Sequence, residues 1–231
     1  MPDTLTLSAS ERRAFDRLAA DLVRVLGPRF QALVATGPTS SAAFASAISA
    51  ADLEALAALA GTWRHDGLDI PLLLTPDEFT RSLDVFPLEY QTIIDRHVVI
   101  TGHPPFDHAH VDPDDLRRAC EVQAKGHLIH LRQGWITAAG HEEELAALVV
   151  HSAPALAALL ASVARLDAHA ASEPNPARAG ARLAGLPDAL VGRVLALIRE
   201  PGGASAVVAD LPAYLQATET LWTFVDTWHA R

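Results

Sequence analysis

Apolar and polar positions follow two different spacings along the first half of the chain. Three stretches have helical spacing: residues 10–26, residues 51–63 and a segment that begins at Pro76. Four short apolar runs have the length of strands: residues 30–36, 42–48, 68–74 and 97–102. The second of these runs fits either a strand or the start of a helix. Helices that alternate with short strands predict a small α/β domain.

The second half of the chain has helical spacing almost throughout. Long helices are predicted at residues 112–136, 142–166, 186–200 and 210–229. We therefore predict an α+β protein: an α/β domain over residues 1–110, followed by an all-α helical bundle over residues 111–231.

One uncharged stretch, residues 145–164, is about 20 residues long and has the length of a membrane span. It is rich in alanine, contains His151 and Pro154, and has three glutamates directly before it. These features favour a buried helix of a soluble protein, with a kink near Pro154.

Composition narrows the possible functions. Half of the 231 residues are hydrophobic and a fifth are charged, which excludes an intrinsically disordered chain. The net charge of −10 argues against a general binder of nucleic acids or anionic membranes. The one cysteine, Cys120, excludes an intrachain disulfide and fits a reducing compartment. Because the N-terminus has no signal-peptide pattern, we expect a soluble, cytoplasmic protein.

Two longer strings carry a resemblance to a known family. They are SLDVFPLEYQTIIDRHVVITG at residues 82–102 and LRRACEVQAKGHLIHLR at residues 116–132. With the predicted layout, they resemble the nucleotidyltransferase superfamily with a polymerase-β-like catalytic domain, and within it a bacterial branch with a helical C-terminal domain. The resemblance covers about residues 10–165. It implies an α/β domain that binds a nucleoside triphosphate with two metal ions held by clustered carboxylates.

The family's catalytic motifs are degenerate in this chain. The resemblance places Gly37 at the glycine of the phosphate-binding turn, but Pro38 stands where the family has serine. It places Ala42 and Phe44 at the two metal-binding carboxylates of the second strand. Asp69 takes the place of the third carboxylate, and one carboxylate cannot hold two metal ions. We therefore expect that nucleotidyl transfer has been lost.

Basic residues recur at intervals of seven on the first long predicted helix. Arg118, Lys125 and Arg132 form a stripe that fits a phosphate or another small anion. The alternative is a solvated face with a Glu121–Lys125 pair. The candidate ligand-binding residues are Gly37, Ser41, Asp69, Arg118, Lys125 and Arg132.

Histidines offer weaker candidates for a metal site. The turn at residues 103–112 carries five possible ligands: His103, Asp107, His108, His110 and Asp112. They match no fixed spacing motif, and an exposed interdomain linker is the alternative. His127 and His130 lie three apart without a third ligand, which predicts partly exposed helix residues. No metal and no cofactor is therefore predicted.

Three functional hypotheses follow. The first is a nucleotidyltransferase-like protein without catalysis that binds a small anionic or nucleotide ligand, a protein partner or a second copy of itself. The second is an active nucleotidyltransferase that uses Mg²⁺ with a nucleoside triphosphate, with Asp69 and either Asp66 or Asp95 as metal ligands. The third is a structural subunit whose cleft is filled by Phe44 and the small alanines beside it.

Overall fold

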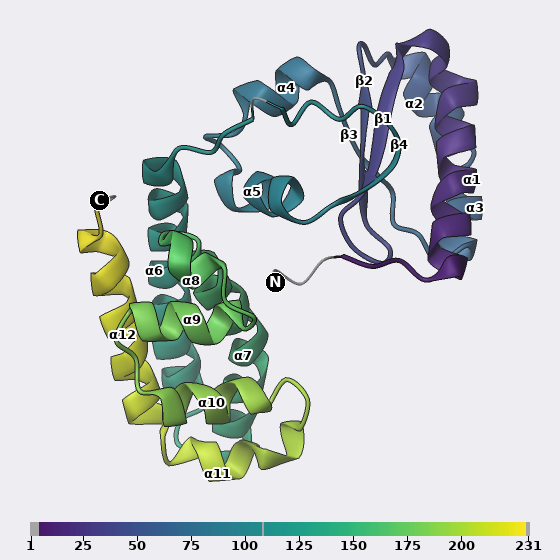
Figure 1. The fold of residues 1–231 in the computed structure, drawn as a ribbon. Coiled ribbons are helices and arrows are strands. Elements are labelled where there is room, and N and C mark those ends of the chain that lie inside the picture. The colour runs from purple at the N-terminus through teal and green to yellow at the C-terminus, as the bar shows by residue number, and fades with distance from the viewer. Residues whose placement is uncertain (1–4, 108, 230–231) are drawn as a thin grey trace. The chain divides into compact units, whose positions relative to one another are not determined.

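The structure, a computed structural model, describes residues 5–107 and 109–229. The chain forms two compact units, Asp3–Asp112 and Pro113–Arg231. The first contains a four-stranded sheet with helices, and the described part of the second is helical (Figure 1). The predicted α+β class, an α/β region followed by helices, is confirmed.

The N-terminal unit is built around a mixed sheet in the order β3-β2-β1-β4. β1 is antiparallel to both β2 and β4, and β2 is parallel to β3. The elements are α1 (Ala9–Leu26), β1 (Phe30–Ala35), β2 (Ser41–Ala45), α2 (Ala50–Ala57), α3 (Ala60–His65), β3 (Leu72–Leu74), α4 (Pro76–Arg81), α5 (Pro87–Asp95) and β4 (Val98–Gly102).

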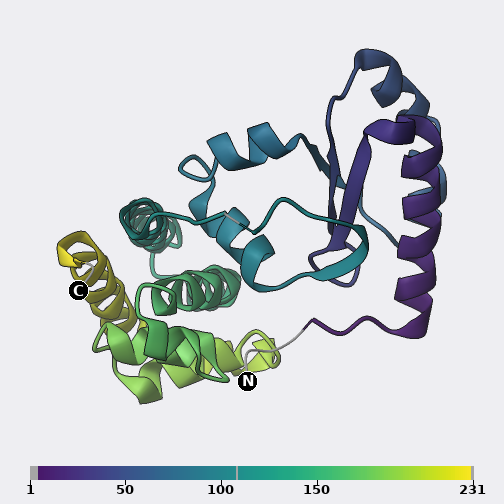
Figure 2. The same cartoon turned by 45° about the horizontal axis from the view of Figure 1, so that its top comes forward.

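The sheet has helices on both faces. Helices α1, α2 and α3 lie on one side of it and α4 and α5 on the other, as Figures 1 and 2 show. Successive strand residues point to opposite faces. Leu33 and Ala43 belong to the same core as Phe15, Leu18 and Trp63 of the first helices. The alternate strand residues therefore face α4 and α5.

Three helices in this unit begin with the same local device. The side chains of Ser8, Ser49 and Thr75 each accept a hydrogen bond from the backbone N–H three residues later. The acidic side chain of that later residue accepts a hydrogen bond from the backbone N–H of the capping residue. Such capping boxes satisfy backbone N–H groups that would otherwise lack partners. They fix the starts of α1, α2 and α4.

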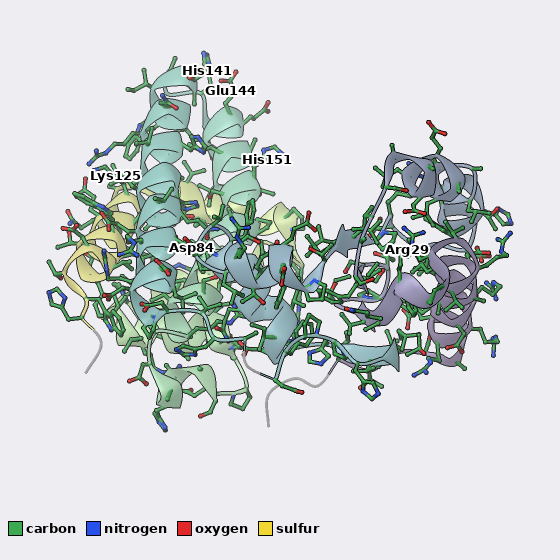
Figure 3. All side chains as sticks on the ribbon, turned by 90° about the horizontal axis from the view of Figure 1, so that it is seen from above. Arg29, Asp84, Lys125, His141, Glu144 and His151 are labelled. Carbon is green, nitrogen blue, oxygen red and sulfur yellow. The ribbon has the colours of Figure 1, made fainter. Side chains whose placement is uncertain are left out.

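A bidentate ion pair connects Arg29, the residue directly before β1, to α2. Arg29 Nη1 and Nη2 donate to the two carboxylate oxygens of Asp52 at 2.6 and 2.7 Å (Arg29 is labelled in Figure 3). Arg29 and then Ser49 hold the pKa of Asp52 well below its usual range. The pair anchors the segment that leaves β2.

Three predicted elements of this unit differ from the observed ones. Residues 42–48 contain a strand, β2, so the helix alternative is wrong. The helix predicted at 51–63 is interrupted between α2 and α3. The strand predicted at 68–74 is only three residues long, because the Leu68 and Asp69 N–H groups donate to Trp63 and Thr39 instead of to a strand.

The described part of the C-terminal unit has a helix at each of the four predicted places, although α10 is nine residues long and shorter than the predicted 186–200, and it has three further short α-helices. Its elements are α6 (Pro113–Thr137), α7 (Glu142–Ala164), α8 (Ala168–Ala171), α9 (Pro176–Leu183), α10 (Asp188–Ala196), α11 (Ala204–Val208) and α12 (Leu211–Thr227). Helix α7 contacts α6, α9, α10 and α11, and α12 packs along α6. The short helices α8, α9 and α11 were not predicted.

Helix α7 contains the uncharged stretch of residues 145–164, preceded by three glutamates in its first turn. By length and composition alone, it is the one described helix that passes as a membrane span, a test that core helices of soluble proteins also pass. Its residues Val149, Leu156 and Leu160 are buried among the other helices of the unit. The helix continues through Pro154. Its contacts fit a core helix of this unit.

Candidate functional site

The resemblance places the two metal-binding carboxylates at Ala42 and Phe44 of β2. Both residues point to the sheet face opposite α1 and are buried, at 1% and 0% exposure. The Phe44 ring meets Phe79 of α4 edge-on, with centroids 5.6 Å apart, and Phe106 at 5.7 Å. The position that resembles a metal-ligand position is therefore filled by an aromatic side chain.

More aromatic rings complete this cluster. Phe79 packs against Tyr90 of α5 at 4.8 Å and against Phe106 at 5.4 Å, and His97 meets Phe106 at 4.7 Å. Aromatic pairs of this kind each contribute about 0.5–1.5 kcal/mol beyond the burial of their area. The cluster makes this face of the sheet a hydrophobic core.

The structure brings the three N-terminal candidate residues close together in the fold. The N–H groups of Thr36 and Gly37 donate to the Ser40 carbonyl and close the β1–β2 loop. Asp69 joins this loop, because its carboxylate accepts from Thr39 Oγ1 at 2.7 Å and its N–H donates to the Thr39 carbonyl. Ser41 begins β2, and its buried Oγ has no hydrogen-bond partner among the described residues.

A surface hollow of about 380 Å³ lies beside the same loop. Pro38 and Thr39 line it from the loop, Arg13 and Arg17 from α1, and Asp66 from the segment before β3. Arg17 Nε donates to Asp66 at 2.8 Å and holds the pKa of that carboxyl below its usual range. Positive and negative groups therefore offset one another in this hollow.

The carboxylates proposed for an active enzyme each bind a different partner. Asp66 binds Arg17, Asp69 accepts from Thr39, and Asp95 accepts from Gln91 Nε2 at 2.7 Å. Clustered carboxylates are needed to hold two metal ions. The described contacts give no support to the hypothesis of an active enzyme.

Over residues 5–107 and 109–229, no three histidine, cysteine, aspartate or glutamate side chains come together as a metal site. This holds for the described residues of the histidine-rich turn: His103, Asp107, His110 and Asp112. His108 lies outside the described residues. It also holds for His141, Glu144 and His151 of the region around α7, which are labelled in Figure 3.

Each residue of the predicted basic stripe has a partner within the helical unit. Arg118 forms an ion pair with Asp115, and Arg132 forms one with Glu219 of α12. Lys125, labelled in Figure 3, places its Nζ 3.4 Å from the centroid of the Trp222 ring. These partners reduce the charge available to a small anion.

The alternative that Glu121 pairs with Lys125 does not match the described contacts. Glu121 accepts from Arg117 Nη1 at 2.7 Å, and Lys125 lies over Trp222.

The helical unit contains a buried polar cluster that was not predicted from the sequence. His127 Nε2 and Tyr214 Oη are 2.8 Å apart, and Ser152 Oγ lies 3.1 Å from the same hydroxyl. These residues come from α6, α12 and α7. The prediction that His127 is partly exposed is wrong, since it is 9% exposed. The signal was its position among Ala124, Leu128 and other apolar residues on one face of α6.

Burial controls the chemistry of these groups. Desolvation lowers the pKa of His127 to about 4, with His130 adding to the effect, and raises the pKa of Tyr214. It also raises the pKa of the free Cys120 thiol to about 12. A thiolate is the reactive form of cysteine, so Cys120 is not a nucleophile at neutral pH.

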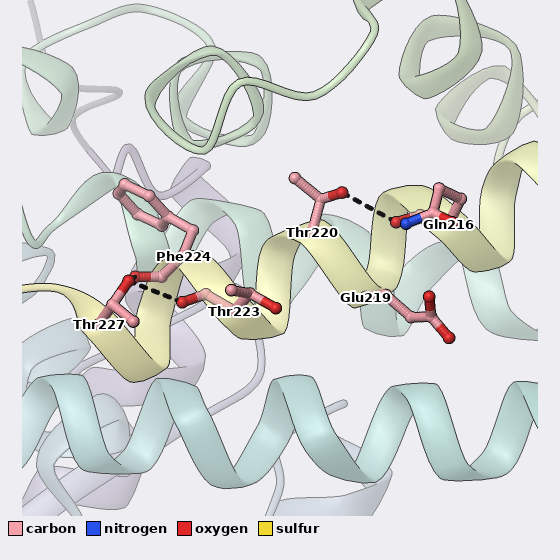
Figure 4. A pocket seen from close by; sticks show the side chains of 6 residues that line it. All are labelled: Gln216, Glu219, Thr220, Thr223, Phe224 and Thr227. Carbon is pink, nitrogen blue, oxygen red and sulfur yellow. Dashed lines mark hydrogen bonds between the residues drawn. The ribbon is translucent and has the colours of Figure 1, made fainter.

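The outer face of α12 lines a second surface hollow of about 410 Å³ (Figure 4). Thr220 and Thr227 donate their hydroxyls to the carbonyls of Gln216 and Thr223 on their own helix, as Figure 4 shows. These hydroxyl donors are therefore already used by the helix.

Comparison with known proteins identifies no relative: no family model, no curated protein and no solved structure matches this chain.

Proposed function

We propose that this chain is a nucleotidyltransferase-like protein without catalysis that works as a binding module. The observation that carries the proposal is the packing of Phe44. Its ring occupies the position where the resemblance expects a carboxylate, and it is buried against Phe79 and Phe106. An apolar ring provides no ligand for a metal ion and excludes water from the position.

The remaining polar groups support the same proposal. Asp69 is held by the β1–β2 loop through Thr39, and Asp66 is held by Arg17. Phosphoryl transfer by this chemistry needs two metal ions that stabilise the attacking and the leaving oxygen. The described residues offer no group of carboxylates to hold them.

The helical unit favours a protein partner over a small anion. Arg118 and Arg132 are paired with carboxylates, and Lys125 lies over Trp222. An anion that bound this stripe would compete with each of these contacts. A protein surface can instead use apolar side chains together with the same charges.

Release of pyrophosphate from each nucleoside triphosphate tests the loss of catalysis, with Mg²⁺ and with Mn²⁺. We expect no release above that of a protein-free control. Asp69→Asn is the matched variant, because it removes the carboxylate that the resemblance places nearest to the lost site. Release that the purified chain produces and Asp69→Asn abolishes would overturn the proposal and support the active-enzyme hypothesis.

A further inference from the structure

An apolar seam runs along the solvent-facing side of α6. Val122, Ile129 and Ile136 are 72%, 41% and 79% exposed and lie seven residues apart. Isolated exposed aliphatic residues are common, but these three are aligned on one side of a single helix, with Gly126 between the first two and Gln133 between the last two. Seven-residue spacing is the pattern by which one helix packs along another.

Small residues accompany the first two of these aliphatic residues. Ala119 lies three residues before Val122, and Gly126 lies between Val122 and Ile129; both are partly exposed, and the exposed Gln133 takes the corresponding place before Ile136. A Cβ added at Gly126 would meet no atom within 4 Å. Large and small residues that alternate in this way form knobs and holes into which the side chains of another helix fit. The seam therefore has the shape of a helix-docking surface.

The charge of this surface differs from that of the chain. Residues 122–141 contain no aspartate or glutamate, although the chain carries 28 acidic residues and a net charge of −10. Lys125 and Arg132 border the seam on the side of α12, to which Trp222 and Glu219 connect them. The surface combines exposed aliphatic side chains with a basic edge.

We propose that the α6 seam, defined by Ala119, Val122, Gly126, Ile129 and Ile136, binds an acidic amphipathic helix of a partner protein. Aliphatic side chains of that helix fill the seam, and its carboxylates meet the basic edge. A second copy of this chain fits less well, because it would bring two edges that each carry Lys125 and Arg132 together. This inference rests on the proposed function, since it names the class of partner of the binding module.

Fluorescence anisotropy with two designed helical peptides tests the proposal on the full chain. Both peptides carry leucine and isoleucine at the apolar heptad positions; one has glutamate and the other lysine at the flanking positions. We expect the glutamate peptide to bind at least about tenfold more tightly than the lysine peptide, with an affinity that falls as salt is added.

Two variants of the chain locate the binding site. Ile136→Glu places a charge in the seam, and Ile198→Glu places one at a similarly exposed isoleucine of the same unit, 46% exposed. We expect the first to weaken binding of the glutamate peptide about tenfold or more and the second to change it less than about twofold. Circular dichroism of both variants verifies that they fold.

Several results would overturn the inference. They are equal binding of the two peptides, binding of neither, and equal effects of Ile136→Glu and Ile198→Glu. A dimer in sedimentation velocity that Ile136→Glu dissociates would assign the seam to a second copy instead. Pyrophosphate release is measured separately, so failure of the proposed function is distinguishable from failure of this inference.

Discussion

On β2, Phe44 lies between two other aromatic rings at a position where the nucleotidyltransferase resemblance expects a carboxylate. Its neighbours come from separate segments, Phe79 from α4 and Phe106 from the chain after β4. A side chain with such neighbours is part of the core, and replacing it affects stability before it affects any ligand.

Phe44→Ala is expected to reduce the free energy of unfolding by about 3–5 kcal/mol, because it leaves a cavity among buried rings. Phe86→Ala is the control, since Phe86 is 50% exposed and its truncation should cost less than about 1 kcal/mol. Urea unfolding followed by circular dichroism measures both. Equal small losses would show that Phe44 is not packed as described.

His127 makes the helical unit sensitive to acid. Its pKa in the folded chain, about 4, lies below its ordinary value of 6.5, so folding favours the neutral ring. The contribution of the neutral His127 ring to the free energy of unfolding is fully present above pH 6.5. It is lost as the pH falls from 6.5 towards 4, because the unfolded chain then binds a proton at this histidine more readily than the folded chain. The expected loss is up to about 3 kcal/mol.

Unfolding of the wild type and of His127→Gln between pH 7 and pH 4 measures this effect. Glutamine retains a polar group that can bond to Tyr214 but does not titrate, so its stability should fall less over this range. Parallel pH curves for the two proteins would contradict the assignment. Tyr214→Phe, which keeps the histidine, should retain an acid-dependent loss.

Among the elements, the close crossing of α9 over α7 depends on one glycine. A Cβ at Gly180 would lie 1.9 Å from the Leu160 carbonyl oxygen, and both are backbone positions that cannot rotate away. Gly180→Ala is therefore expected to destabilise the helical unit by about 2–3 kcal/mol. Gly126→Ala, where the added Cβ meets open space on α6, should instead stabilise by about 0.5–1 kcal/mol.

Thermal unfolding of the two glycine variants tests this prediction, because the expected shifts have opposite signs. Both variants replace a helical glycine of the same unit by alanine. A difference between their unfolding temperatures therefore reflects the atoms that surround each added Cβ. A Gly180→Ala variant as stable as the wild type would show that α9 does not approach α7 so closely.

Elements with a local signal were predictable from the sequence. Thr75 and Pro76 mark the start of α4, and the periodic stripe of residues 10–26 gives α1 almost to its ends. The short β3 was not predictable in length, because the partners of the Leu68 and Asp69 N–H groups lie elsewhere in the chain.

The candidate site was predictable only in part, because the partners of its residues also lie elsewhere in the chain. The sequence shows that Ala42 and Phe44 are not carboxylates, but not which rings surround Phe44. The stripe of Arg118, Lys125 and Arg132 was visible from its spacing, whereas its partners on α12 depend on tertiary packing. His127 was misjudged because its burial depends on α7 and α12 as well as on its own helix.

At the scale of the whole molecule, the chain consists of two compact units with separate cores. The Phe44 cluster belongs to Asp3–Asp112, whereas Gly180 and His127 belong to Pro113–Arg231. Compact units of this size have their own hydrophobic cores and can unfold as separate cooperative transitions.

Differential scanning calorimetry of the wild type is therefore expected to show two transitions. Phe44→Ala should lower the temperature of one and Gly180→Ala that of the other. A single transition that both variants lower equally would show instead that the units unfold as one. Because the variants perturb different cores, each assigns one transition.

Calorimetric titration of the chain with ATP, with and without Mg²⁺, most directly tests the proposal that nucleotide–metal chemistry has been lost. With Phe44 in the core and Asp69 held by Thr39, we predict no saturable heat that depends on Mg²⁺. Saturable, Mg²⁺-dependent binding of ATP that Asp69→Asn removes would contradict the claim.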